Sequence, residues 1–544
     1  MKKKATAVKK VITGILASTM VLSGCSGSGT SPTAAPPSTT GGMEAQAVTQ
    51  EAPAELTVMA WDRGDSAPGT TADNNALTKW ITAQVLADCN IKVTFVPVPR
   101  KTADDKLNVM MAGGSAPDIV FTYTRTLVMD YAEKGGLLEL TPYLEQYGTE
   151  IQKNLGDVQH IGYMSNGQYA LMQKAATTAD GFTKADYGSY IRKDWVDKLG
   201  KKLPTNQEEL LALLHEFKEK DPGNVGADKL IPWAMSGLSD GARNFLPFVS
   251  SYAETCDEEH ILVYDDRLAA IAPGTKEALQ IMNQLYNEGI ISKDFPVDTS
   301  ADKYIQDITN GNVGFFMNDS ERPINQDYLT TLKQNVPDAE FIPINVCKMP
   351  DGSYQQTAED KYKRYIMIPK TNEANAKTAM IYLNWLANPE IAEKINFTPD
   401  FTHAEDGSRI ELSTEEKNAK GYPGVCGDYN LLNGALDVIT KEQKVKSYMS
   451  ARPELGEAFY NTFYDVSTKD LVFPIIPEIS IKSQAKYGTN VDNMIIEFVY
   501  KVVSTSVDKF ESTYQAEYDK LAQAGLTEIL KERQNYYDNH YNKK

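Results

Sequence analysis

Aromatic rings beside polar groups are the residue combination in this sequence that suggests a binding chemistry. Trp61, Asp62 and Arg63 follow one another directly, and Tyr123 follows another apolar run. An aromatic face packs against the C–H groups of a sugar ring, while planar polar groups bind its hydroxyls. Core packing is the other explanation for each ring, and composition alone does not separate the two.

Two further tryptophans and two further arginines are either candidate ligand-binding residues or structural residues. Trp233 falls in an expected loop and fits either, whereas Trp195 falls in the first turns of an expected helix and fits a core better. Arg192 and Arg364, like Arg63, carry the planar donor fork that binds a carboxylate with two hydrogen bonds. Structural salt bridges in an acidic protein explain these arginines more simply. If they do line the site, an acidic sugar is the expected ligand.

Catalytic motifs are not apparent. The sequence contains no Gly-x-Ser-x-Gly elbow, HExxH motif or phosphate-binding glycine loop. Its five histidines are scattered, and the residue four positions after His215 is Glu219 rather than a second histidine. We therefore expect a binding protein without catalytic residues, metal or cofactor. Counting carboxylates does not rule out a glycosidase pair, so a surface glycan hydrolase is the alternative from another class.

Charge and length narrow the class further. The formal net charge is −18, and without the five lysines among residues 1–24 it is more negative still. Nucleic-acid recognition needs basic clusters, so we expect no nucleic-acid partner. The 544 residues exceed the roughly 250–300 that one hydrophobic core supports, so two or more lobes are expected.

The N-terminus has the pattern of a secretory signal. Five lysines precede an apolar run at 11–22, which is too short for the about 20 residues of a membrane-spanning helix. The run ends in Leu22-Ser23-Gly24-Cys25, which resembles the lipobox of bacterial lipoproteins. That resemblance implies a signal peptide at 1–24 and a lipid on Cys25. Residues 25–54 are small, polar and proline-rich, which predicts a flexible tether.

The elements that carry the first candidates follow a β-α-β-α-β order. Hydrophobic periodicity predicts strands at 55–61, 91–96 and 118–121, with helices at 75–87 and 104–111. This order predicts a parallel sheet covered by helices and hence an α/β fold class. Ligands of such sheets lie beyond the carboxyl ends of strands, which points to residues 61–63 and 123–124.

The same alternation continues along the chain. Thr205 and Glu208 have capping-box spacing, which predicts a helix that extends to about residue 219. Further strands are expected at 188–192, 312–317 and 365–369, and further helices at 193–199, 276–288, 301–309, 374–387 and 497–541.

Several stretches, taken in order, resemble family 1 of the extracellular solute-binding proteins of ABC importers, in its large oligosaccharide-type group from Gram-positive bacteria. They are KLNVMMAGG at 106–114 with APDIV at 116–120, GQY at 167–169, YIRKDWVDKLG at 190–200 with PT at 204–205, IMIPK at 366–370 with NWL at 384–386, and GLTEI at 525–529.

This resemblance implies a two-lobed, periplasmic-binding-protein-like fold with a ligand cleft between the lobes. The N-terminal lobe would hold residues 55–165 and about 360–400, and the C-terminal lobe residues 166–359 and about 401–544. The resemblance implies that a monomer, anchored at the extracellular face of the cell membrane, captures an oligosaccharide. It would then deliver this ligand to the permease subunits of an ABC transporter. An oligopeptide receptor is the alternative among binding proteins.

One segment departs from the family pattern. Relatives often carry a calcium loop of the form D-P-N-G-N-G-x-x-D-E, and the matching stretch here is DPGNVGADKL at 221–230. Asp221 and Gly226 remain, but Gly223 and Val225 supply no side-chain oxygen and the ninth position is Lys229. Calcium takes six to eight oxygen ligands, so we expect no bound calcium.

Overall fold

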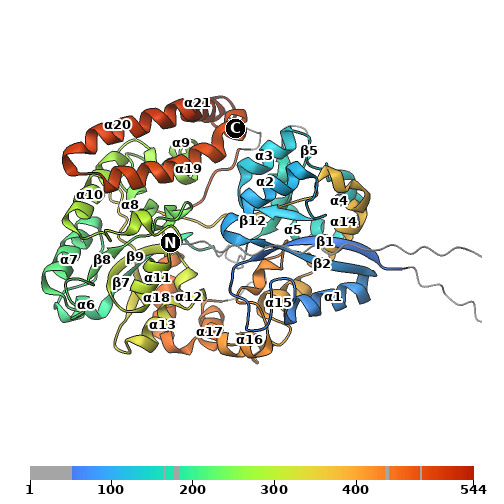
Figure 1. Cartoon of the computed structure of the whole chain (residues 1–544), viewed down its shortest axis with the longest axis horizontal. Helices are drawn as coiled ribbons and strands as arrows, with labels where there is room; N and C mark the ends of the chain where they lie inside the picture. Colours follow the sequence, from blue (N-terminus) through green and yellow to red (C-terminus); the bar gives the residue numbers. More distant parts are fainter. Residues whose placement is uncertain (1–51, 165–166, 176–182, 435–439, 478–480, 544) are drawn as a thin grey trace, which may run out of the picture. The chain divides into compact units, whose positions relative to one another are not determined.

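The first sheet begins with two parallel strands. The computed structural model describes residues 52–164, 167–175, 183–434, 440–477 and 481–543. β1 (Ala54–Asp62) and β2 (Ile91–Pro99) pair along their whole length, and α1 (Ala76–Cys89) connects them (Figure 1). The expected β-α-β unit is thus present. Cys25 and the expected signal peptide lie outside the described residues.

More distant segments extend this sheet. α2 (Ala103–Gly113) leads to β3 (Val120–Thr122), and Ile119 just before it pairs in parallel with Val58 of β1. β12 (Tyr362–Met367) lies between β3 and β6 (Leu171–Lys174) and runs antiparallel to both. The parallel arrangement predicted for the first three strands is confirmed, and β12 makes the sheet mixed.

A second sheet has the strand order β10-β7-β9-β8. β7 (Tyr187–Arg192) runs antiparallel to β9 (Val313–Asp319) and β10 (Phe341–Ile344), whereas β8 (Ile231–Ala234) runs parallel to β9. Six of the seven residues of β9 are buried, as its apolar sequence requires for an interior strand. In Figure 1 these strands lie beside α6 (Lys193–Lys198) and α7 (Gln207–Lys220).

The start of α7 differs from the predicted capping box. Its cap is Asn206, whose side chain accepts a hydrogen bond from the backbone N–H of Glu209. The Glu209 carboxylate in turn accepts from the N–H and the hydroxyl of Thr205, at 2.7 and 2.9 Å. The predicted pairing of Thr205 with Glu208 is therefore wrong by one residue, because asparagine caps a helix as well as threonine does.

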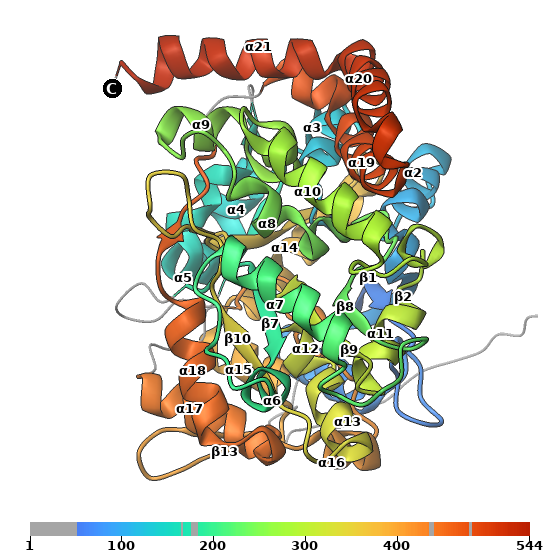
Figure 2. The same ribbon diagram turned by 90° about the vertical axis from the view of Figure 1, so that its left-hand side faces the viewer.

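The helical stretch predicted at 497–541 consists of separate helices. α19 (Lys482–Ser504), α20 (Phe510–Leu521) and α21 (Thr527–Tyr536) lie together at the C-terminus (Figure 2). Gly525 joins α20 to α21 with a φ of 116°, and a Cβ there would collide with the Tyr487 ring. Only glycine accommodates both conditions.

No described helix is both long and apolar enough to cross a membrane. Four cysteines in the described residues, Cys89, Cys256, Cys347 and Cys426, are free thiols. The remaining helices are α3 (Arg125–Glu133), α4 (Thr141–Tyr147), α5 (Thr149–Gln159), α8 (Leu246–Ser250), α9 (Glu258–Val263), α10 (Thr275–Glu288), α11 (Asp302–Thr309), α12 (Arg322–Asn325), α13 (Tyr328–Asn335), α14 (Ala376–Leu386), α15 (Pro389–Phe397), α16 (Thr414–Lys420), α17 (Lys441–Ala451) and α18 (Glu457–Ser467).

Each sheet has its own large buried core. Val58 and Ile366 lie in the first core, and Phe315 lies in the second. The first core also contains Leu171 and Leu432. Residues 422–432 and Ala485 also pack in the first core, and β6 joins it by pairing with β12. The lobe boundaries expected near residues 165, 360 and 400 stay predictions.

Three segments pair side by side where the chain passes from one core to another. Ala185 pairs with Ala358, and β11 (Gln356–Thr357) pairs in parallel with β15 (Leu471–Val472). The N–H of Ala185 donates to the carbonyl of Ser467 at 2.6 Å. We call residues 183–186, 356–359 and 467–472 the linking segments.

Candidate functional site

The carboxyl ends of three strands bring aromatic and guanidinium groups together. Trp61 lies near the end of β1, Arg100 directly follows β2, and Tyr123 directly follows β3. The ring centres of Trp61 and Tyr123 are 5.0 Å apart. The Arg100 guanidinium carbon lies 4.3 Å from the centre of the Trp61 ring and 5.3 Å from that of Tyr123. These strand ends meet because their strands run parallel.

Asp428 holds two more arginines against these rings. Arg364 of β12 donates through Nη2 to Asp428 Oδ1 at 2.9 Å and through Nη1 to the Asp428 carbonyl at 2.8 Å. Arg63 donates to the same carboxylate from Nε and Nη2, at 2.5 and 3.0 Å. Arg364 also lies 4.7 Å from the Trp61 ring centre, and its Nε donates to the Tyr123 hydroxyl at 3.4 Å. We call Trp61, Arg63, Arg100, Tyr123, Arg364 and Asp428 the strand-end cluster.

Of the two rings in the strand-end cluster, Tyr123 is the accessible one. Trp61 is 4% exposed, because Arg100 and Arg364 cover its ring and Phe121 packs against it at 4.7 Å. Tyr123 is 41% exposed. A stacking platform must be reachable by the ligand, so Tyr123 is the better platform and Trp61 supports the groups above it.

The charges of the cluster influence one another. Burial would raise the pKa of Tyr123, but the charge and hydrogen bond of Arg364, together with the charge of Lys363, lower it. Burial raises the pKa of Asp65, against the attraction of Arg63. Burial also lowers the pKa of Arg100. Three guanidinium groups, Arg63, Arg100 and Arg364, thus face two carboxylates, Asp428 and Asp65.

Charged groups next to the second sheet interact with this cluster. Burial would raise the pKa of Asp240, but Arg243 and, to a smaller extent, Arg322 and Arg100 lower it. Arg243 pairs with Asp240 at 2.8 Å and with Asp319, at the end of β9, at 3.0 Å. Asp240, in the loop that follows β8, is therefore the group from the second sheet's side that interacts with Arg100.

Arg192 makes contacts that do not belong to the strand-end cluster. It is 3% exposed and forms two hydrogen bonds with the Asp194 carboxylate, at 2.8 and 2.9 Å. A third hydrogen bond reaches the Gly311 carbonyl at 2.9 Å, and the guanidinium lies over Trp195. Each of its three guanidinium nitrogens donates to the protein itself, so the structure supports the salt-bridge explanation of Arg192.

Trp233 and Asp62 also depart from the expected site. Trp233 has no exposed surface, because it packs edge-on between Phe248 and Phe315 in the second core. Asp62 is exposed, and its Oδ1 accepts the N–H of Gly64 at 2.9 Å, which shapes the turn after β1. The structure thus favours the core explanation of Trp233, whose contact with a ligand stays a prediction, and it places Asp62 next to the cluster.

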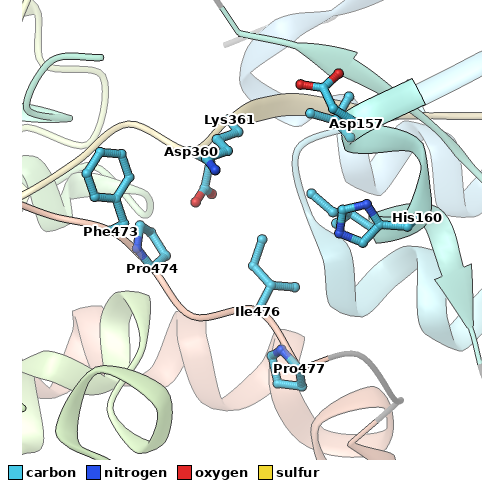
Figure 3. Close-up of a pocket in the computed structure, with 10 residues that line it drawn as sticks. Asp157, His160, Asp360, Lys361, Phe473, Pro474, Ile476 and Pro477 are labelled. Carbon is cyan, nitrogen blue, oxygen red and sulfur yellow. The ribbon is translucent and has the colours of Figure 1, made fainter. Parts of the chain in front are cut away.

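A separate cavity of about 610 Å³ shares no lining residue with the strand-end cluster. It lies between the end of α5, the segment before β12 and the segment after β15, and Asp360 and His160 project into this region (Figure 3). None of the described residues that line it is a tryptophan or an arginine. The lining residues are Asp157, Val158, His160, Ile161, Asp360, Lys361, Phe473, Pro474, Ile476 and Pro477.

The sequence analysis did not indicate two members of the strand-end cluster, Arg100 and Asp428. Arg100 directly follows β2, which ends at Pro99, but the strand was predicted to end at residue 96, so the strand-end rule did not indicate Arg100. Asp428 lies more than 300 residues after Arg63 along the chain and ends a short 3-10 helix (Cys426–Asp428), so no local pattern connects the two.

The segment compared with a calcium loop is held by its own backbone. Asp221 accepts hydrogen bonds from the N–H groups of Val225 and Gly226, at 3.0 and 2.8 Å. Lys198 donates to the carbonyl of Pro222 at 3.1 Å. Among the described residues, no three His, Cys, Asp or Glu side chains converge as a metal site would require.

The chain belongs to the family of bacterial extracellular solute-binding proteins, whose pattern matches residues 67–393. The fold is accordingly the two-lobed α/β fold of periplasmic binding proteins. Among solved structures it is similar to the alginate-binding protein AlgQ2 without calcium ion, with a TM-score of 0.65, 19% identity and coverage of 90% of this chain and 99% of that one.

Sequence relatives cover most of the chain. The polygalacturonan/rhamnogalacturonan-binding protein YtcQ of Bacillus subtilis is 22% identical over 82% of this chain and 85% of its own length. Lipoprotein LipO of the same organism is 23% identical over 82% of this chain and 86% of its own length. The chain is also similar to the substrate-binding protein FusA of S. pneumoniae in complex with fructo-nystose, with a TM-score of 0.65, 16% identity and coverage of 90% and 100%.

Proposed function

We propose that this protein captures an oligosaccharide outside the cell and delivers it to the permease of an ABC transporter. The observation that carries this proposal is the strand-end cluster, in which the exposed Tyr123 ring lies beside planar guanidinium donors. An aromatic face and planar donors are the two elements that sugar binding needs. Relatives named for polygalacturonan, rhamnogalacturonan and fructooligosaccharide binding support the ligand class.

The proposed role requires neither turnover nor a cofactor. The protein acts as a monomeric receptor, and the family and its structural neighbours are binding proteins. Two functions compete with this proposal. An oligopeptide receptor would bind a peptide instead of a sugar, and a glycan hydrolase would shorten the glycan that it binds.

A direct test is a thermal-shift and calorimetry screen of the purified protein with oligosaccharides and oligopeptides, followed by chromatography of the ligand. We expect stabilisation by one oligosaccharide class and unchanged ligand after incubation. Tyr123→Ala should abolish or weaken that binding, whereas Phe473→Ala, an exposed ring in the separate cavity, should not. Binding of peptides alone, or shortened glycan products, would refute the proposal.

We also propose that a lipid on Cys25 holds the protein at the outer face of the membrane. The lipobox at 22–25 and the similarity to a protein named as a lipoprotein support this attachment. Cys25→Ala should release the protein from the membrane fraction and abolish incorporation of labelled lipid. Retention of both properties in the variant would exclude the anchor.

A further inference from the structure

Arg100 differs from the other two arginines of the strand-end cluster. Arg63 and Arg364 share the Asp428 carboxylate. Within the described residues, the side chain of Arg100 forms no hydrogen bond and no ion pair, and its Nε is inaccessible to solvent and without an acceptor. A desolvated polar group without a partner costs free energy, and a charged one costs more. Arg100 is therefore the cationic group of this site that lacks a bound anion.

The surroundings fix the position of this guanidinium. Its carbon lies 4.3 Å from the centre of the Trp61 ring and 5.3 Å from that of Tyr123, so two aromatic rings hold it in place. The charged groups that face it are Arg63, Asp240 and Asp428. Asp428 already binds two arginines, and Asp240 is paired with Arg243 at 2.8 Å. Neither carboxylate is free to neutralise Arg100.

We propose that Arg100 binds the carboxylate of a uronic acid residue, so that the ligand is an acidic oligosaccharide. This inference rests on the proposed function and specifies its ligand class. A guanidinium offers parallel N–H donors that match the two oxygens of a carboxylate. The exposed Tyr123 ring, 5.3 Å from the Arg100 guanidinium carbon, supplies the face on which the sugar ring of the same residue stacks.

The local charge favours an anion although the protein as a whole is acidic. The carboxylates that face Arg100, Asp428 and Asp240, are already paired with other arginines, so they leave its charge uncompensated although the formal net charge of the chain is −18. A neutral sugar would leave Arg100 without an ionic partner. The site should therefore discriminate between a uronate and its uncharged ester, and this preference should decrease with added salt.

The test compares charged and neutral forms of the same sugar. Calorimetry would measure binding of oligogalacturonate and oligoalginate and of their fully methyl-esterified forms to the wild-type protein, Arg100→Gln and Arg100→Lys. We expect at least one acid form to bind wild type on the order of 10- to 100-fold more tightly than its ester. Arg100→Gln should remove that preference, and Arg100→Lys should retain only part of it.

Asp240→Asn is the matched control. If Arg100 serves only to pair with Asp240, both variants should lower the melting temperature alike and leave the acid preference intact, which would overturn the inference. If Arg100 binds the ligand, Asp240→Asn should keep the preference for the acid. Binding of neutral oligosaccharides alone would also overturn the inference while the proposed function stands. Failure of every oligosaccharide to bind would instead remove the proposed function.

Discussion

Arg364 and Asp428 form an ion pair at 2.9 Å in which each side chain is only 5% exposed. Arg63 binds the second oxygen of the same carboxylate. Removal of one partner from a buried pair leaves an uncompensated charge, which typically costs about 3–5 kcal/mol. Asp428→Asn should therefore lower the free energy of unfolding in urea by about this amount. Glu55→Gln, in an exposed pair with Lys92, should change it by about 0–1 kcal/mol. Equal effects of the two substitutions would contradict the buried pairing.

Trp61 and Tyr123 should separate stability from affinity. Trp61 is buried, so Trp61→Ala should lower the free energy of unfolding by about 3–5 kcal/mol. Tyr123 is exposed, and loss of a stacked ring worth on the order of 1–3 kcal/mol should weaken ligand binding by roughly 5- to 150-fold. Melting temperature and calorimetry on both variants test this division. A stable Trp61→Ala variant with lost affinity would instead make Trp61 the platform.

Positions along a strand were more predictable than partners across the chain. The strand-end rule placed Trp61 and Tyr123 near each other, and their rings are 5.0 Å apart. It did not distinguish a covered ring from an exposed one, because Arg100 and Arg364 cover Trp61 from other parts of the chain. Trp233 was ambiguous for the same reason: the side chains that enclose it, Phe248 and Phe315, are far from it in sequence.

The turn at 221–230 should make stability independent of calcium. Asp221 uses both carboxylate oxygens to accept backbone hydrogen bonds, from Val225 and Gly226. A ligand that binds only the native state raises the melting temperature by an amount that grows with the logarithm of the ligand concentration above its dissociation constant. We expect the same melting temperature in EDTA and in millimolar calcium chloride, measured by differential scanning calorimetry. A melting temperature that keeps rising with the logarithm of the calcium concentration would contradict this expectation.

Asp186, in a linking segment, should make stability depend on pH. Burial, followed by the nearby Asp319 and Glu359, raises its pKa to about 7, although Lys184 opposes the shift. Because the pKa of the folded state exceeds the ordinary value of 3.8, the native state holds an extra proton between these two values. Its contribution to stability is therefore complete at low pH and decreases as the pH rises from about 4 to 7.

Asp186→Asn should remove this dependence. The melting temperature of the variant should exceed that of the wild type by more at pH 8 than at pH 5. Asp73→Asn, at an exposed aspartate, should follow the wild-type profile. Identical profiles for Asp186→Asn and the wild type would show that Asp186 has an ordinary pKa.

The linking segments limit how the two cores can move. The Ala185 N–H donates a hydrogen bond to the Ser467 carbonyl, and Ala185 pairs with Ala358 as in a β-bridge. The Ala358 N–H in turn donates to the Val472 carbonyl. A single covalent crossing would allow torsion about any axis. Three crossings that are hydrogen-bonded side by side form a small sheet. Such a sheet bends easily about one axis, and it resists twisting unless its hydrogen bonds break. Any rotation of one core against the other is therefore mechanically concerted, because a change of backbone angle in one linking segment must be matched in its neighbours.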